Sequence, residues 1–226
     1  MQYSLSLRFR SVPIVTLYVG AEKAIYHVHE KLLLDVSPVF KAGFSGEFAE
    51  SGTRSMNLPD DDVDAVERML QWLYTRQLRL SDAILEATSN DCCWELARLN
   101  TLADKYDIVA LKNIIADKLF ELYSLVESFS DAEPPKLSVV ACIYNNTART
   151  SAFRKIMVAW YTWGTCMSFC RELTAGHDLA QIPEFAADLA VSFALMSAFK
   201  EKNPMLSSSS MLYEKDSEEV KEDKAE

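Results

Sequence analysis

The sequence predicts an α+β fold, because extended and helical segments occur in separate groups rather than in alternating β-α units. Residues 14–19 alternate apolar with polar side chains, and a turn at Gly20 leads into a second extended run, residues 24–29, which predicts a β-hairpin. A third extended run follows at residues 54–58. The next segment has the spacing of one buried helical face, with apolar residues at Val66, Met69, Leu70 and Leu73.

Two short helices are expected between the hairpin and the third strand, over residues 31–36 and 39–44. Ser37 is the expected N-cap of the second helix, and Pro38 suits its first position because proline lacks the N–H that a helix leaves unpaired there. The acidic run Asp60-Asp61-Asp62 precedes the next helix. We interpret this run as helix capping rather than as a cation site, because the positive end of the helix dipole favours acidic side chains.

Further apolar stripes predict a pair of helices that closes the first domain. The domain with this pair spans residues 12–123, and its core spans residues 12–80. The prolines Pro134 and Pro135 indicate a linker over residues 124–136. An all-helical extension is expected over residues 137–202. Residues 203–226 contain four consecutive serines and mainly acidic charges, which predicts a disordered acidic tail. The stripes of the closing pair are Leu96, Leu99, Ala103 and Tyr106, then Leu111, Ile114, Ile115, Leu119 and Leu122.

Composition narrows the class of partner. The 226 residues carry a net charge of -10, which disfavours binding to nucleic acid or to anionic membranes, because both attract lysine and arginine clusters. No apolar segment approaches the roughly 20 residues of a membrane-spanning helix, and the N-terminus does not resemble a secretory signal. Five cysteines without regular spacing suit a reducing compartment. We therefore expect a cytoplasmic or nuclear protein.

Several sequence blocks resemble the BTB/POZ domain in content, order and spacing. The extension, through Tyr144-Asn145-Asn146-Thr147 and Phe153-Arg154-Lys155, is similar to short fungal BTB-only proteins. The blocks of the first domain are Val15-Thr16-Leu17-Tyr18-Val19-Gly20, Tyr26-His27-Val28-His29-Glu30-Lys31-Leu32-Leu33-Leu34, Ser37-Pro38-Val39-Phe40, Glu50-Ser51, Met56-Asn57-Leu58-Pro59-Asp60-Asp61, Leu70-Gln71-Trp72-Leu73-Tyr74-Thr75, Ala103-Asp104-Lys105-Tyr106 and Leu111-Lys112-Asn113.

The resemblance implies a small β-sheet capped by helical hairpins, whose exposed faces bind another copy or a partner protein. Many relatives present bound substrates to a cullin-type ubiquitin ligase through a motif of a hydrophobic residue, any residue and Glu. Phe48 and Glu50 occupy the matching positions here and are the expected protein-binding residues. Ile14 stands where dimeric relatives carry an acidic residue of a charged groove. The alternative function is a nuclear co-regulator or scaffold that uses the domain without ubiquitin chemistry.

Self-association is expected from the N-terminal segment. Leu5, Leu7 and Phe9 alternate with polar residues, which predicts an extra strand that adds to a sheet edge of the same chain or of a neighbour. We therefore expect a homodimer.

Residues able to carry chemistry form no catalytic or cofactor-binding pattern. His27 and His29 share a strand face, but a zinc site needs three or four ligands. His177 has no acid or nucleophile nearby in sequence. We therefore expect no enzyme activity, no metal and no cofactor. The cysteines Cys92, Cys93, Cys166 and Cys170, and the aromatic cluster Trp160, Tyr161 and Trp163, are interpreted as core residues rather than as a metal site and a ligand site.

Overall fold

The computed structural model describes residues 13–45, 49–79, 89–127, 134–163 and 179–199, and Tyr213. The chain forms two compact units, one of residues Met1–Gln77 and Tyr106–Ile108, the other of Leu78–Lys105 and Val109–Glu226. Strands occur in the first unit and helices in both, so the predicted α+β class is confirmed. None of the helices in the described ranges is both long enough and apolar enough to cross a membrane.

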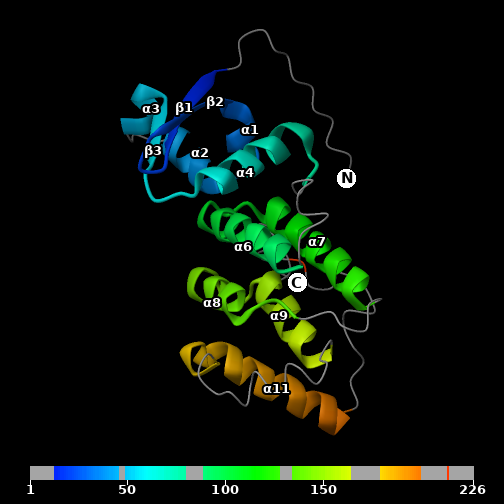
Figure 1. Ribbon diagram of the computed structural model, residues 1–226. Helices are drawn as coiled ribbons and strands as arrows, with labels where there is room; N and C mark the ends of the chain where they lie inside the picture. Colours follow the sequence, from blue (N-terminus) through cyan, green and yellow to red (C-terminus); the bar gives the residue numbers. More distant parts are fainter. Residues whose placement is uncertain are drawn as a thin grey trace, which may run out of the picture. The chain divides into compact units, whose positions relative to one another are not determined.

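The described residues of the first unit form a three-stranded sheet in the order β2-β1-β3 (Figure 1). Strands β1 (Ile14–Val19) and β2 (Ala24–His29) form the predicted antiparallel hairpin, and β3 (Ser55–Leu58) pairs with β1 in parallel. The hairpin turn begins at Gly20, whose φ of +71° favours glycine. A Cβ there would also lie 3.0 Å from Val63 Cγ2, a tight contact that would displace the Val63 side chain.

In the described part of this unit, four helices accompany the sheet, namely α1 (Glu30–Leu34), α2 (Pro38–Ser45), α3 (Ala49–Thr53) and α4 (Val63–Thr75). Ser37 caps α2 as predicted, since its Oγ accepts a hydrogen bond from Phe40 N at 3.1 Å. Asp62 caps α4 by accepting one from Ala65 N at 2.8 Å. The buried face of α4 includes Trp72, which the predicted stripe omitted, whereas Leu70 is only half-buried.

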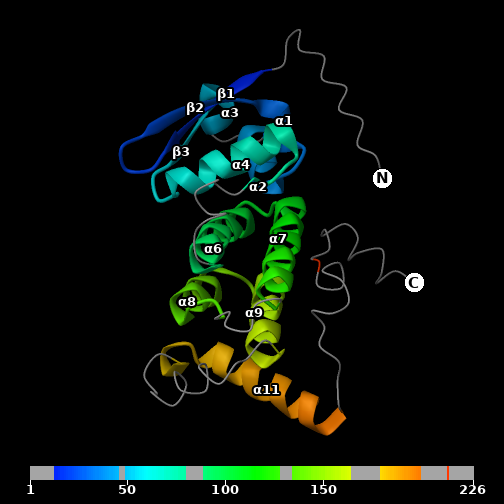
Figure 2. The same ribbon diagram turned by 45° about the vertical axis from the view of Figure 1, so that its right-hand side comes forward.

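The second unit is helical throughout its described part, and its helices pack against one another (Figure 2). Helix α6 contacts α7 and α8, α9 contacts α7 and α8, and α11 packs on α8 and α9. Tyr123 of α7 meets Trp160 of α9 in a T-shaped contact with ring centroids 5.4 Å apart. The helices are α6 (Ser89–Lys105), α7 (Val109–Glu127), α8 (Leu137–Asn146), α9 (Ala152–Trp163), the 3₁₀ turn η1 (Leu179–Gln181) and α11 (Pro183–Phe199).

Two segments differ from the boundaries that the sequence predicted. Helix α7 continues to Glu127, so the expected linker begins inside it, because the chain has no helix breaker before Pro134. At the other end of that linker, Lys136 N donates to Asn90 Oδ1 at 2.7 Å and the Pro135 carbonyl accepts a hydrogen bond from Tyr161. The end of the expected linker is thus held against α6 and α9.

The second difference concerns Tyr106, which we predicted to extend the buried stripe of α6. That helix ends at Lys105, and Tyr106 instead belongs to the first unit, where its ring stacks on Phe40 with centroids 4.4 Å apart. The chain turns at the next residue, Asp107, whose φ is +50°. Tyr106 therefore has the expected burial but contributes to a different core.

Candidate protein-interaction surfaces

The expected cullin-contacting motif lies where α2 is followed by α3. Glu50 is in the first turn of α3 and is half-buried, whereas Phe48 lies outside the described residues. Arg54, which follows α3, contacts both β1 and α1. Its carbonyl accepts a hydrogen bond from Thr16 N at 2.9 Å, and its Nη1 forms an ion pair with Glu30 Oε2 at 2.8 Å. Glu50 therefore sits on a short helix whose C-terminal end is anchored to β1 and α1.

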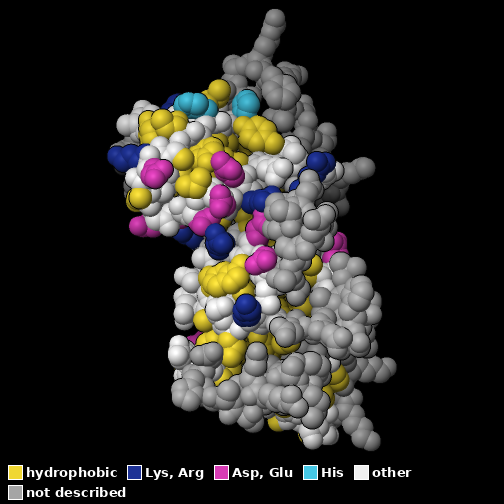
Figure 3. Space-filling model, in the orientation of Figure 1, with side chains coloured by type: hydrophobic (Ala, Val, Ile, Leu, Met, Phe, Trp, Pro, Cys, Tyr) yellow, Lys and Arg dark blue, Asp and Glu magenta, His cyan; other side chains and the backbone are white. Residues whose placement is uncertain are grey.

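One face of the sheet is open to solvent. Val15, Leu17 and Val19 of β1 are buried, so the intervening residues of β1 and their cross-strand partners lie on the opposite face. Exposed apolar side chains on that face are Ile14, 53% exposed, and Ile25, 60% exposed. Figure 3 shows histidine side chains among hydrophobic ones over this part of the first unit. Among the described residues, Ile14 and Ile25 thus give this face apolar contact area.

The two histidines of β2 both have hydrogen-bonding partners in the protein. His27 Nδ1 lies 3.2 Å from Thr16 Oγ1 on the neighbouring strand. His29 Nδ1 lies 2.9 Å from the hydroxyl of Tyr74, which also accepts a hydrogen bond from His29 N at 3.1 Å. His29 is therefore a hydrogen-bonded residue at the end of β2. Tyr74 itself is 49% exposed on α4 and adds an aromatic side chain to the surface of the unit.

The acidic run before α4 has two roles rather than one. Asp62 caps the helix as predicted, but Asp61 is buried and accepts a hydrogen bond from the Tyr106 hydroxyl. Burial and that carboxylate both raise the pKa of Tyr106, so the phenol stays protonated as a donor. Ser37 Oγ also donates to the Tyr106 carbonyl at 2.6 Å. Asp61 and Ser37 together fix the Tyr106–Ile108 turn in the first unit.

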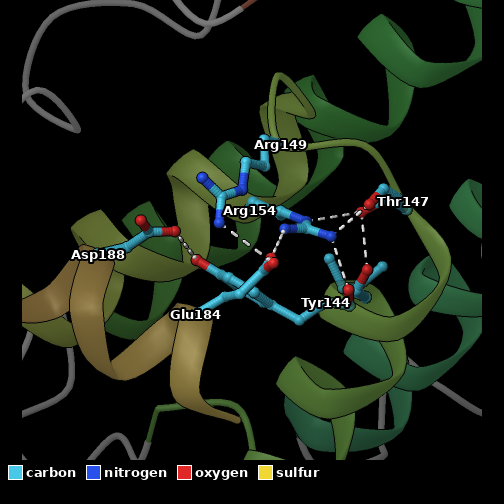
Figure 4. Close-up of polar contacts among 7 residues, drawn as sticks. Tyr144, Thr147, Arg149, Arg154, Glu184 and Asp188 are labelled. Atoms are coloured by element: carbon cyan, nitrogen blue, oxygen red, sulfur yellow. Dashed lines mark hydrogen bonds and ion pairs between the residues drawn. The ribbon is translucent and has the colours of Figure 1, made fainter.

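Sequence reasoning did not find the polar cluster of the second unit, which centres on Arg154 (Figure 4). Arg154 Nη2 donates to the carbonyl oxygens of Tyr144 and Thr147, Nε donates to Thr147 Oγ1 at 3.2 Å, and Nη1 pairs with Glu184 Oε2 at 2.8 Å. The guanidinium also lies over the Tyr144 ring, 4.5 Å from its centroid. A buried arginine with these partners holds helices α8, α9 and α11 together.

The remaining chemistry-bearing residues have core environments where the structure describes them. Trp160 and Tyr161 are buried, as the core interpretation predicted, and Trp163 is half-buried. Cys92 and Cys93 are buried on α6, and burial raises the pKa of the Cys93 thiol to about 12, which keeps it protonated and unreactive. The described residues contain no group of three or more metal-ligating side chains. Cys166, Cys170, His177 and the N-terminal residues Leu5, Leu7 and Phe9 lie outside the described ranges.

Comparison with protein-family models gives a match to the BTB/POZ domain over residues 11–121. The match covers the sheet, α1 to α4, α6 and most of α7, so it includes the helix pair that packs on the C-terminal helices. A BTB/POZ domain is a protein–protein interaction module rather than a catalytic domain. The family match agrees with the observed fold, which has the hairpin, the parallel third strand and the helical caps that the resemblance implied. Through residues 11–121, the chain belongs to the BTB/POZ domain family.

Proposed function

We propose that this chain is a non-enzymatic adaptor of the cytoplasm or nucleus that self-associates and brings a bound protein to a cullin-type ubiquitin ligase. The observation that carries the proposal is the position of Glu50, in the first turn of the short helix between α2 and β3. In the family that the sequence resembles, cullin-binding members often carry a motif of a hydrophobic residue, any residue and Glu between the second helix and the third strand. Glu50 is also half-exposed, as a contact residue needs to be.

The test is capture of a cullin by the full chain and by the variant F48A/E50A. Truncating an aromatic anchor commonly costs about 2 kcal/mol of binding, so we expect roughly thirtyfold weaker capture. The unfolding free energy should change by no more than about 0.5 kcal/mol, as for surface residues generally. Glu22→Ala is the control, because Glu22 is an exposed glutamate of the same unit in the β1–β2 turn.

Two results would contradict the interpretation of Phe48 and Glu50 as cullin-contacting residues. One is cullin capture that survives both substitutions. The other is a loss of about 3–5 kcal/mol of stability on Phe48→Ala alone, which would indicate a core phenylalanine. Capture of other proteins without any cullin would favour the alternative, a nuclear co-regulator or scaffold.

The self-association part of the proposal rests on the sheet edges. In the strand order β2-β1-β3, β2 and β3 are the outer strands among the described residues, so an added strand can pair with either. The alternating segment with Leu5, Leu7 and Phe9 directly precedes β1 in the sequence. Light scattering at tens of micromolar chain should give a mass above that of the monomer. A strictly monomeric mass there would contradict this part of the proposal.

A further inference from the structure

Tyr213 is the one described residue beyond α11, and it contacts helix α7 from far away in the sequence. Its hydroxyl donates a hydrogen bond to Asp117 Oδ1 at 2.5 Å, across a separation of 96 residues. Both residues belong to the second unit, and Figures 1 and 2 show the red segment at Tyr213 beside α7 in both views. Tyr213 is 37% exposed, so more than half of its surface is covered. The C-terminal segment thus has a defined contact on α7.

The surface of α7 around Asp117 combines one carboxylate with apolar side chains. Ile114 and Phe120 stand three residues before and after Asp117, which makes them its neighbours on the helix surface. All three residues are half-buried. Lys118, the nearest cation in the sequence, pairs with Glu121 at 2.6 Å. We call Ile114, Asp117 and Phe120 the Asp117 site, which offers an anionic acceptor between two apolar contacts.

Tyr213 has the complementary chemistry. Its side chain joins an apolar ring to a hydrogen-bond donor, and the bond of 2.5 Å lies in the range of charge-assisted O–H···O⁻ bonds, which are about twice as strong as neutral ones. Met211 and Leu212 directly precede it, between a run of four serines and a charged run. Interfaces depend mainly on a few anchors, among which tyrosine is enriched. Tyr213 with its two apolar neighbours therefore has the composition of an anchor.

We infer that the Asp117 site is a peptide-docking surface and that residues 211–213 of the same chain occupy it through Tyr213. A partner protein that binds this surface needs a tyrosine beside apolar residues, and it has to displace the chain's own segment. The segment is thus an intramolecular inhibitor of the surface that it covers. This inference goes beyond the proposed adaptor function and involves neither Phe48 nor Glu50.

A weak contact is sufficient for docking within one chain. Residues 200–212 join α11 to Tyr213, and a short tether gives an effective concentration on the order of millimolar. A segment that binds as a free peptide with a dissociation constant of about 100 µM would then be docked roughly ten times more often than it is released. Loss of the Asp117 acceptor should remove most of this excess. Release of the segment is therefore the quantity to measure.

The first measurement is the rate at which chymotrypsin cleaves the full chain after Leu212 and Tyr213, because a protease needs the segment released from α7. Asp117→Ala removes the acceptor and leaves the cleaved sequence unchanged. Asp91→Ala is the matched control, since Asp91 is an exposed aspartate on α6 of the same unit. Cleavage should be about fivefold faster in Asp117→Ala than in wild type and unchanged in Asp91→Ala. Circular dichroism melts establish that both variants are folded.

The second measurement is binding of a fluorescein-labelled peptide of residues 207–216, followed by fluorescence anisotropy. The full chain with Tyr213→Ala leaves the site vacant and should bind this peptide about tenfold more tightly than wild type, whose site is occupied. A peptide with Tyr213→Phe lacks the donor, and a peptide phosphorylated at Tyr213 places a dianion beside Asp117. Both should bind at least about fivefold more weakly than the unmodified peptide.

Three results would overturn the inference. One is equal cleavage of wild type and Asp117→Ala, and another is equal peptide binding by wild type and Tyr213→Ala. The third is protection from cleavage that increases with protein concentration, because the segment of a second copy would then occupy the site. Cullin capture keeps the two proposals separate. Tyr213→Ala should capture a cullin as wild type does, and absence of capture by both would count against the adaptor function alone.

Discussion

Arg154 and Glu184 join helix α9 to helix α11 through an ion pair of 2.8 Å between Nη1 and Oε2. The arginine side chain is 6% exposed and the glutamate 46% exposed, so a buried cation meets a carboxylate that reaches the surface. Arg149 approaches the other oxygen of the same carboxylate at 3.3 Å, with its own side chain 82% exposed. Two arginines in contrasting environments thus share one partner.

That contrast predicts unequal effects of removing the two arginines. Arg154→Ala leaves the carbonyl oxygens of Tyr144 and Thr147 without their buried donor and should lower the free energy of unfolding by about 3 kcal/mol or more. Arg149→Ala should change it by less than about 0.5 kcal/mol, because exposed ion pairs contribute little. Urea unfolding of both variants beside wild type measures the difference. Equal losses would show that Arg154 does not hold the helices together.

Acid should weaken the same connection. Hydrogen bonds from Arg154 and then Arg149 hold the pKa of Glu184 below its ordinary value of 4.5. Because the folded-state pKa is the lower one, the stabilisation is fully present above pH 4.5 and is lost as the pH falls through the folded-state value. The melting temperature of Glu184→Gln should therefore lie below that of wild type at pH 7 and approach it towards pH 3. A gap of constant size across that range would contradict the ion pair.

The local elements of the fold could be predicted from the sequence, because hydrophobic periodicity and helix capping depend on residues only a few positions apart. The strand alternation around Leu17, the cap at Ser37 and the stripe containing Met69 all occur in the structure. Long-range partners were not accessible in this way. Tyr106 fitted the stripe of α6 by spacing, yet its ring lies against Phe40 in the other unit, because a turn at Asp107 takes it out of the helix.

The interaction surfaces were predicted only in part for a related reason. A short motif points to Glu50 because its residues are neighbours in the chain, and Glu50 lies half-buried in the first turn of α3. The Arg154 cluster was missed because its partners are up to 30 residues away in the sequence.

Removal of residues 203–226 should leave the fold intact. The one residue of this segment that the structure describes, Tyr213, is 37% exposed and donates a hydrogen bond to Asp117 Oδ1 at 2.5 Å. An exposed contact of this kind contributes about 1 kcal/mol at most, so truncation before Asn203 should shift the melting temperature by only a few degrees. Tyr213→Phe, which removes only the hydroxyl, should account for most of any shift. A much larger loss on truncation would mean that the segment packs on the helices.

The buried pair of Tyr106 and Asp61 should be the most sensitive polar contact of the first unit. Tyr106→Phe keeps the ring on Phe40 but removes the donor to Asp61, which is 7% exposed. A buried carboxylate that loses this donor should cost about 1–3 kcal/mol of stability. Tyr74→Phe is the matched control, because it also removes one tyrosine hydroxyl, from a side chain that is 49% exposed, and should cost less than about 1 kcal/mol.

A second variant that also neutralises Asp61 separates the cost of burying an unpaired carboxylate from any change in the packing of the Tyr106 ring. The double variant Tyr106→Phe with Asp61→Asn should recover part of the loss, because a neutral amide is less costly to bury than a carboxylate. Wild type, Tyr106→Phe, Asp61→Asn and the double variant form a double-mutant cycle. The coupling free energy between the two side chains should be at least about 1 kcal/mol. Chemical denaturation followed by tryptophan fluorescence suits the measurement, since Trp72 lies in the core of the same unit. Additive losses would show that the hydroxyl and the carboxylate contribute to stability independently of one another.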